Sequence, residues 1–222
     1  MKPFSLRLAP LVVAAVLVAG CSSLNPFASS APKPAPLADF KPTAQLAANW
    51  RASIGESGPY RFQPAVSRDG VFAAGHEGEV ARFEDGRAVW RVDTDIELSA
   101  GVGSDGRLAV VVATDGTVIA LDADNGSERW RSAVGAEVLA PPAVSLDFVI
   151  VRASDNRLIA LNARDGSRRW VYQRNNPPLA LRSYAGVLIE GPVVLAGFPG
   201  GKLAVINLAN GGAITELGVA VP

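Results

Sequence analysis

The side chains that most often perform catalysis or bind metals are scarce in this chain. His76 is the only histidine among the 222 residues, and Cys21 is the only cysteine. A single histidine leaves no second nitrogen or sulfur ligand for a zinc site, and it makes a Ser-His-Asp arrangement implausible. His76 stands in a turn just before Gly78, where we expect a solvent-exposed loop residue. The sequence therefore predicts no catalytic residue, no metal and no cofactor.

The carboxylates are numerous but stand where turns are expected. Asp115, Asp122 and Asp155 each follow an apolar run. Aspartate at such positions accepts hydrogen bonds from nearby backbone N–H groups. Acid–base chemistry by these side chains stays open, but the turn role accounts for each of them. No glycine loop of the phosphate-cradling kind is present, and we interpret Gly200–Gly201 and Gly211–Gly212 as hairpin glycines.

Chemistry of another kind is indicated at Cys21. Lys2 and Arg7 form a basic leader, and an apolar run from Leu8 to Ala19 follows it. This is the pattern of a secretory signal peptide over residues 1–20, too short to span a bilayer permanently. Its end, Val18-Ala19-Gly20-Cys21, resembles a bacterial lipobox, although Leu is commoner where Val18 stands. The alternative is an ordinary signal peptide followed by an incidental cysteine.

The lipobox resemblance implies that Cys21 becomes the lipidated first residue of the mature chain. Several acyl chains anchor a protein stably, whereas one binds a membrane only marginally. In lipoproteins of this kind Ser22, rather than Asp, favours the outer membrane. Residues 21–42 are rich in Ser, Ala and Pro and predict an extended tether without a core. Its prolines are Pro26, Pro32, Pro34, Pro36 and Pro42.

A repeat of 40 residues organises the rest of the chain. The four tryptophans recur in one register, at Trp50, Trp90, Trp130 and Trp170. Two copies read GTVIALDADNGSERW (116–130) and NRLIALNARDGSRRW (156–170). A shorter copy spans 78–90, and a fourth begins at Gly201 with Thr215 in the tryptophan position. Such a period is the signature of stacked supersecondary units that cannot bury their apolar faces alone.

Within each copy the pattern favours short strands. Val118–Leu121 and Leu158–Leu161 are apolar runs bounded by turn residues, and similar runs precede them at Leu108–Ala113 and Phe148–Ala153. Asp-Gly, Asn-Gly and Asp-Asn pairs between runs suit tight hairpins. Each repeat therefore predicts four antiparallel strands, the unit of a β-propeller blade. Residues 43–222 are thus expected to form an all-β, partial β-propeller.

The tryptophans and a recurring glycine are expected to be structural. A tryptophan on the outer strand can pack on the next blade and donate its indole N–H to a carbonyl there. The pattern A-[LI]-[DN]-x-x-x-G-x-x-x-W places Gly126 and Gly166 before Trp130 and Trp170, and Gly86 fills this position in the shorter copy. This pattern resembles the repeat of quinoprotein-type propellers, which implies about four blades here of an expected eight. The chain then resembles an N-terminal fragment, in which Trp50 belongs to an outer strand that completes the last blade.

Charge and one irregular segment bear on partners. Removing residues 1–20 leaves 19 basic against 21 acidic residues, a net charge of −2, which gives no attraction to nucleic acid or an anionic bilayer. After Trp170 the spacing grows by five residues, and Pro177–Pro178 stiffen the segment. Leu179, Leu181 and Arg182 follow, a plausible anchor for a protein partner. Alternatively, the two leucines are buried in a blade.

Taken together, these features resemble the BamB family, lipoproteins of the outer-membrane β-barrel assembly machinery. The resemblance implies a non-enzymatic scaffold at the outer membrane, facing the periplasm, that assists folding and insertion of outer-membrane proteins. It gives Leu179, Leu181 and Arg182 the role of docking on the POTRA domains of BamA. Other components of the machinery and unfolded outer-membrane proteins are further partners it allows.

Two alternatives remain. A pyrroloquinoline-quinone (PQQ)-dependent dehydrogenase shares the blade repeat, but such enzymes typically carry a vicinal cysteine pair and a calcium site. An outer-membrane lipoprotein that binds another envelope component is the other alternative.

Overall fold

The computed structural model describes residues 43–44, 47–174 and 184–219. Contacts divide the chain after Ala47, and the strands all belong to the unit Ala48–Pro222. The predicted signal peptide, residues 1–20, and the tether, residues 21–42, lie outside the described residues. The described fold is therefore that of the unit from Ala48 onward.

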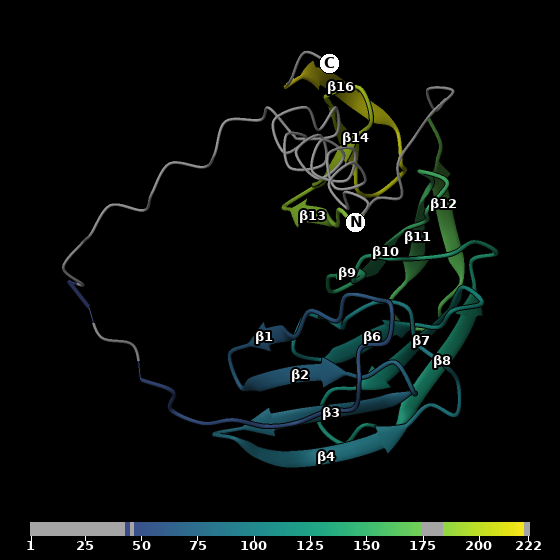
Figure 1. Cartoon of the computed structure of the whole chain (residues 1–222). Coiled ribbons are helices and arrows are strands. Elements are labelled where there is room, and N and C mark those ends of the chain that lie inside the picture. Colours follow the sequence, from purple (N-terminus) through teal and green to yellow (C-terminus); the bar gives the residue numbers. More distant parts are fainter. Residues whose placement is uncertain (1–42, 45–46, 175–183, 220–222) are drawn as a thin grey trace, which may run out of the picture. The chain divides into compact units, whose positions relative to one another are not determined.

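Sixteen strands form four antiparallel sheets of four strands each, and every sheet is a meander in chain order (Figure 1). The first blade contains β1 (Ala65–Ser67), β2 (Gly70–Ala74), β3 (Glu79–Glu84) and β4 (Arg87–Asp93). The second contains β5 (Gly103–Ser104), β6 (Leu108–Val112), β7 (Thr117–Asp122) and β8 (Glu128–Ala133). The third contains β9 (Ala143–Val144), β10 (Phe148–Arg152), β11 (Leu158–Asn162) and β12 (Arg168–Tyr172). The fourth contains β13 (Val187–Glu190), β14 (Val193–Phe198), β15 (Lys202–Asn207) and β16 (Ala213–Gly218). The predicted blades are therefore confirmed.

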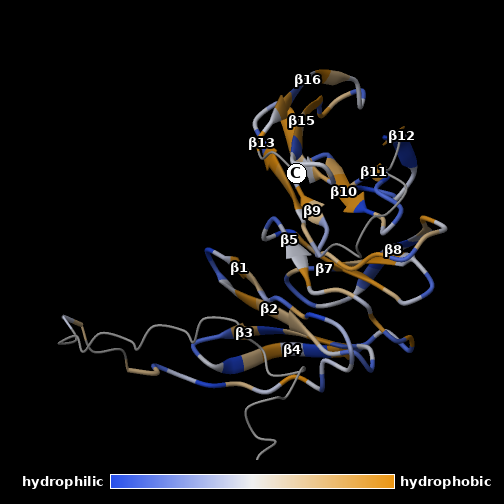
Figure 2. Cartoon of the chain, turned by 45° about the horizontal axis from the view of Figure 1, so that its top comes forward, coloured by the Kyte–Doolittle hydropathy of each residue, from blue (hydrophilic) through white to orange (hydrophobic). Residues whose placement is uncertain are grey.

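The middle strands are continuous apolar runs because both of their faces are covered. In the second blade β6 and β7 are buried at every position after the first. Outer strands alternate instead, so that Trp130 is buried between the exposed Arg129 and Arg131. In Figure 2, β10 is mainly hydrophobic in colour and the outer strand β12 is hydrophilic. In the first three blades the alternation directs the tryptophan of the outer strand toward the next blade, whereas β16 of the fourth blade is exposed throughout and carries Thr215 in that position.

The hydrophobic core lies between blades. One cluster joins the second and third blades and includes Val110, Val118 and Ile159. Equivalent clusters join the first blade to the second and the third to the fourth. The short first strands also touch in succession, β1 with β5, β5 with β9, and β9 with β13. Each blade is therefore stabilised chiefly by packing on its neighbours, as stacked repeats require.

Every blade carries the same irregularity in its last hairpin. A register shift interrupts the pairing of the third and fourth strands one residue beyond the position opposite the tryptophan. In the fourth blade the equivalent position is opposite Thr215. Such bulges bend a strand and redirect its side chains. The shifts lie between Arg82 and Phe83, Ala120 and Leu121, Ala160 and Leu161, and Val205 and Ile206.

The outer strand predicted at Trp50 stays a prediction, because the last blade that it would complete is not among the four described sheets. The described residues from Ala47 to Ser57 contain no strand. The Trp50 ring instead stacks on Phe83 of the first blade, with 6.5 Å between ring centroids. Arg91 of β4 donates a hydrogen bond to the Ser53 carbonyl at 2.7 Å, which holds this segment along the blade. The tryptophan register thus follows a side-chain contact and does not require a strand around it.

Candidate functional site

Three tryptophans lie at the seams between blades. Trp90, Trp130 and Trp170 are each less than a tenth exposed. Each indole Nε1–H donates to a backbone carbonyl of the following blade, which satisfies the one polar group that these side chains bury. The acceptors are Ala123 at 2.9 Å, Ala163 at 2.9 Å and Leu208 at 2.8 Å.

A glycine of the next blade lies against each of these rings. Gly166, which has φ +71°, is packed so closely that an added Cβ would lie 2.5 Å from Cε3 of Trp130. The left-handed backbone and the close approach both require glycine there. Trp50 makes the same contact with Gly86 in the first blade. The four pairs are Trp50 with Gly86, Trp90 with Gly126, Trp130 with Gly166, and Trp170 with Gly211.

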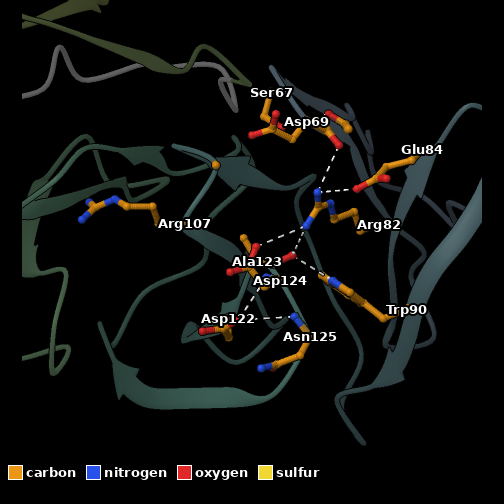
Figure 3. Close-up of polar contacts among 12 residues, drawn as sticks. Ser67, Asp69, Arg82, Glu84, Trp90, Arg107, Asp122, Ala123, Asp124 and Asn125 are labelled. Carbon is orange, nitrogen blue, oxygen red and sulfur yellow. Dashed lines mark hydrogen bonds and ion pairs between the residues drawn. The ribbon is translucent and has the colours of Figure 1, made fainter.

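Arg82 adds a polar bridge at the first seam (Figure 3). Its guanidinium donates to the Ala123 carbonyl of the second blade and to the Asp69 carbonyl of its own blade, both at 3.1 Å. It also pairs with Glu84 and with Asp124, the latter at 3.4 Å. The side chain is only 9% exposed. Its Nη1 and Nη2 atoms are matched in this way, whereas its buried Nε has no hydrogen-bond partner among the described residues. Buried arginine is tolerated when its charge is paired.

Sequence reasoning missed Arg82, although a signal was present. Arg82 lies opposite Trp90 in the β3–β4 pairing, where the second and third blades carry Ala120 and Ala160. The fourth blade carries Val205 there, so a charged residue at a position that is otherwise small and apolar marks a local specialisation of the repeat.

The aspartates at turns bond to the backbone. Asp115 and Asp155 each accept the N–H of the residue two positions on. Asp122 accepts N–H groups of the turn that follows it and pairs with Arg129 at 2.6 Å. Burial alone would raise the pKa of Asp122, but these hydrogen bonds and the Arg129 charge outweigh it and lower the pKa. Asp122 is therefore ionised at neutral pH and cannot act as a general acid.

His76 is not the solvent-exposed loop residue that the sequence predicted. Its side chain is only 20% exposed, and the ring packs on Tyr60 with 5.2 Å between centroids. Nδ1 lies 2.7 Å from the Leu98 carbonyl, which requires a proton on that nitrogen. The backbone N–H of Leu98 in turn donates to the His76 carbonyl. His76 is therefore a structural link between the β2–β3 turn and the chain that leads to the second blade.

An open hollow of about 500 Å³ lies over turns of the second and third blades. Its charged lining side chains are largely matched within the protein. Arg107 pairs with Asp105 at 2.7 Å, and Arg129 pairs with Asp122. None of its lining residues is a histidine, cysteine, serine or lysine. This arrangement stabilises turns and offers no nucleophile paired with a base.

Two further kinds of site were sought among the described residues, a metal-binding group and a membrane-spanning helix. Among the described residues, no three histidine, cysteine, aspartate or glutamate side chains are grouped so that they could hold a metal ion. No helix within the described ranges is long and apolar enough to cross a membrane.

The residues predicted to bind lipid and a partner, Cys21, Leu179, Leu181 and Arg182, lie outside the described residues. The chain on either side of the predicted partner-binding residues is described. Arg174 pairs with Glu216 of the fourth blade at 3.1 Å. Tyr184 lies under the Arg61 guanidinium, 4.9 Å from its ring centroid. The residues on either side of 175–183, Arg174 and Tyr184, are therefore held by contacts with the propeller.

Comparison with known proteins gives one consistent family. A family model described as outer membrane protein assembly factor BamB matches residues 76–222. The outer membrane protein assembly factor BamB of Burkholderia pseudomallei is 41% identical over 213 residues, which are 94% of this chain and 55% of that protein. The chain spans about half the length of the curated relatives it matches.

Solved structures agree on the fold. The crystal structure of BamB from Moraxella catarrhalis matches with a TM-score of 0.66 and 29% identity, over 70% of this chain and 48% of that one. A quinohemoprotein alcohol dehydrogenase from Comamonas testosteroni matches with a TM-score of 0.59 at 14% identity, over 73% of this chain and 35% of that one. At that identity the second likeness concerns the fold alone. The blades are therefore of the quinoprotein type that the repeat predicted.

Proposed function

Because the chain belongs to the family of the outer membrane protein assembly factor BamB, we propose that it is a non-enzymatic assembly factor of the outer membrane. In this role it docks on the POTRA domains of BamA and assists the folding and insertion of outer-membrane proteins. The observation that carries the proposal is the family match over residues 76–222, together with the four blades built from those residues.

The seams support a scaffolding role. A scaffold must hold its contact surfaces at fixed separations, and tightly packed interiors transmit position without yielding. Buried indoles bonded to the next blade, and glycines that leave no room beneath them, give each seam this rigidity.

The anchor and the docking residues complete the proposal. Lipid on Cys21, with residues 21–42 as a tether, holds the propeller at the periplasmic side of the outer membrane. Leu179, Leu181 and Arg182 contact BamA. Apolar side chains beside an arginine form the kind of small cluster that dominates binding energy in protein interfaces.

A dehydrogenase is not proposed. The likeness to the quinohemoprotein enzyme rests on 14% identity and concerns the fold.

The test is binding of the full chain, with its lipid-bearing cysteine replaced by serine for solubility, to a purified fragment that contains the POTRA domains. We expect the Leu181→Ala/Arg182→Ala variant to bind at least about tenfold more weakly, because it removes an apolar anchor and its charge. The dissociation constant is measured by calorimetry, and circular dichroism verifies the fold.

The matched control is Leu146→Ala/Arg164→Ala. Leu146 is 63% exposed, and Arg164 lies in the turn that precedes β12, at the end of that strand opposite to residues 175–183. This control removes the same side-chain types without touching the proposed surface and should bind as the unaltered chain does. Equal affinities of the two double variants would refute the docking role.

A further inference from the structure

Phe198, the last residue of β14, is contacted by three side chains from the third blade. The guanidinium of Arg152 lies 5.2 Å from its ring centroid, and that of Arg174 lies 5.9 Å from it. Tyr172 packs on the same ring at 5.9 Å between centroids, tilted by 55°. Phe198 itself is 7% exposed. Cations over an aromatic face attract its quadrupole, and the attraction is stronger where water is excluded.

Strand alternation explains why the third blade reaches this ring. Side chains two residues apart on a strand point to the same face. Trp170 faces the fourth blade, so Tyr172 and then Arg174 follow it on that side while Val171 and Gln173 are exposed. Glu216 of β16 binds both side chains: its carboxylate accepts a hydrogen bond from the Tyr172 hydroxyl at 3.2 Å and pairs with Arg174 Nη2 at 3.1 Å.

Arg152 reaches the same ring from the inner side of the blade. It is 5% exposed, and burial lowers the pKa of its guanidinium. One nitrogen donates to Asn156 Oδ1 at 3.1 Å, and another donates to the Ala185 carbonyl at 3.4 Å. Arg152 thus connects Phe198 to the chain just after residues 175–183.

These contacts place both flanks of one segment on one ring. Arg174 is the last described residue before residues 175–183, and Ala185 lies two residues after them. Arg174 touches Phe198 directly, whereas Ala185 is held through Arg152. The distance and direction between the two flanks are consequently set by the seam between the third and fourth blades.

We propose that Arg152, Tyr172, Arg174, Phe198 and Glu216, the Phe198 cluster, are positioning residues that present Leu179, Leu181 and Arg182 to the partner. The inference rests on the proposed function, because the importance of that segment comes from its docking role. The cluster itself touches no partner. It acts by holding Arg174 and Ala185, the described residues on either side of the segment, in fixed positions, which lowers the ordering cost of binding.

The test replaces Phe198 by leucine, which keeps an apolar side chain but removes the aromatic face. The matched control is Phe148→Leu. Phe148 is 9% exposed, carries the Arg169 guanidinium at 5.1 Å and belongs to the same core cluster as Phe198, but among the described ring and cation contacts it has none with Arg152, Tyr172 or Arg174. Both variants lose one buried ring, Phe198→Leu with two cation contacts and Phe148→Leu with one, so their effects on general stability should be comparable. Phe198→Tyr restores the ring and serves as the rescue variant.

Two readouts separate the inference from the function on which it rests. Amide hydrogen exchange of residues 172–174 and 184–187 should be faster in Phe198→Leu than in Phe148→Leu, and near the original rate in Phe198→Tyr. Affinity of the full chain for the POTRA fragment should fall about tenfold in Phe198→Leu, equivalent to about 1.4 kcal/mol, and little in the other two variants.

Each result decides something. Weak binding by Leu181→Ala/Arg182→Ala with unchanged binding by Phe198→Leu would overturn the positioning role and leave the proposed function standing. Equal loss of affinity in Phe198→Leu and Phe148→Leu would also overturn it, since the effect would then be general destabilisation. Unchanged binding by the double variant would refute the docking function and with it the presentation of those residues, while hydrogen exchange would still measure the contact to the flanks.

Discussion

Replacing Gly166 by alanine tests how much stability a single seam contributes. An added Cβ would lie 2.5 Å from Cε3 of Trp130, and 2.8 and 3.0 Å from two further ring atoms. Because real Cβ contacts are not that short, the indole must move away from the third blade. The movement stretches the 2.9 Å hydrogen bond from its Nε1 to the Ala163 carbonyl. The alanine must also adopt φ near +71°, which L-residues disfavour.

The magnitude is the sum of these parts. The left-handed conformation costs alanine about 1–2 kcal/mol. Forcing a ring out of a packed site costs about 1–3 kcal/mol. The strained indole bond adds up to about 1 kcal/mol. Gly166→Ala should therefore lower the free energy of unfolding by about 2–6 kcal/mol.

Gly135 provides the control. It has φ +67°, but no atom lies within 4 Å of the position that its Cβ would occupy. Gly135→Ala should thus lower the free energy of unfolding only by the cost of the left-handed conformation, about 1–2 kcal/mol. The difference between the two variants isolates the seam. Urea unfolding followed by far-ultraviolet circular dichroism measures both, and shifted midpoints with unchanged slopes would indicate altered native stability. Equal losses in the two variants would refute the reasoning.

Two further substitutions probe the polar parts of the structure. Arg82→Met keeps most of the buried volume but removes the bridge to the Ala123 and Asp69 carbonyls, so urea unfolding should show a loss of about 2 kcal/mol, and no loss would contradict a stabilising bridge. Asp122→Asn removes a carboxylate whose pKa is lower in the folded state than in the unfolded state, where it is near 3.8. Such a carboxylate stabilises the fold above pH 3.8, and this stabilisation is lost as the pH falls through its folded-state pKa. The variant should therefore be less stable than the original chain at pH 7, and the gap should close in unfolding measurements made below pH 3.8, whereas a constant gap would contradict it.

The blades could be predicted because their determinants are local and repeated. The apolar composition of runs such as Leu108–Val112 and Thr117–Asp122 predicts buried strands, and the Asp and Gly residues between them predict hairpins. Predicted strands that ended at Ala113 and Ala153 end one residue earlier in the structure, which is within the usual fraying of strand ends. The 40-residue tryptophan spacing supplied the number of strands in a unit.

The remainder depends on contacts between residues distant in the chain. Trp50 shares the spacing of the other tryptophans and their glycine contact, but the spacing did not reveal that its ring also stacks on Phe83. His76 looked exposed because nothing nearby in the sequence reveals the Leu98 carbonyl or the Tyr60 ring. The Phe198 cluster joins Arg152, Arg174 and Glu216, which share no motif. Only packing of the third blade on the fourth brings them together.

The tryptophan seams have a spectroscopic consequence. Trp90, Trp130 and Trp170 each belong to one blade by sequence, but each is shielded from water by the next blade along the chain. Their emission therefore reports on the neighbour's integrity and not on that of the sheet that carries them. Local opening of the fourth blade would shift the fluorescence emission of Trp170 alone to longer wavelength. Variants that keep only one of the tryptophans could therefore reveal the order in which the sheets separate.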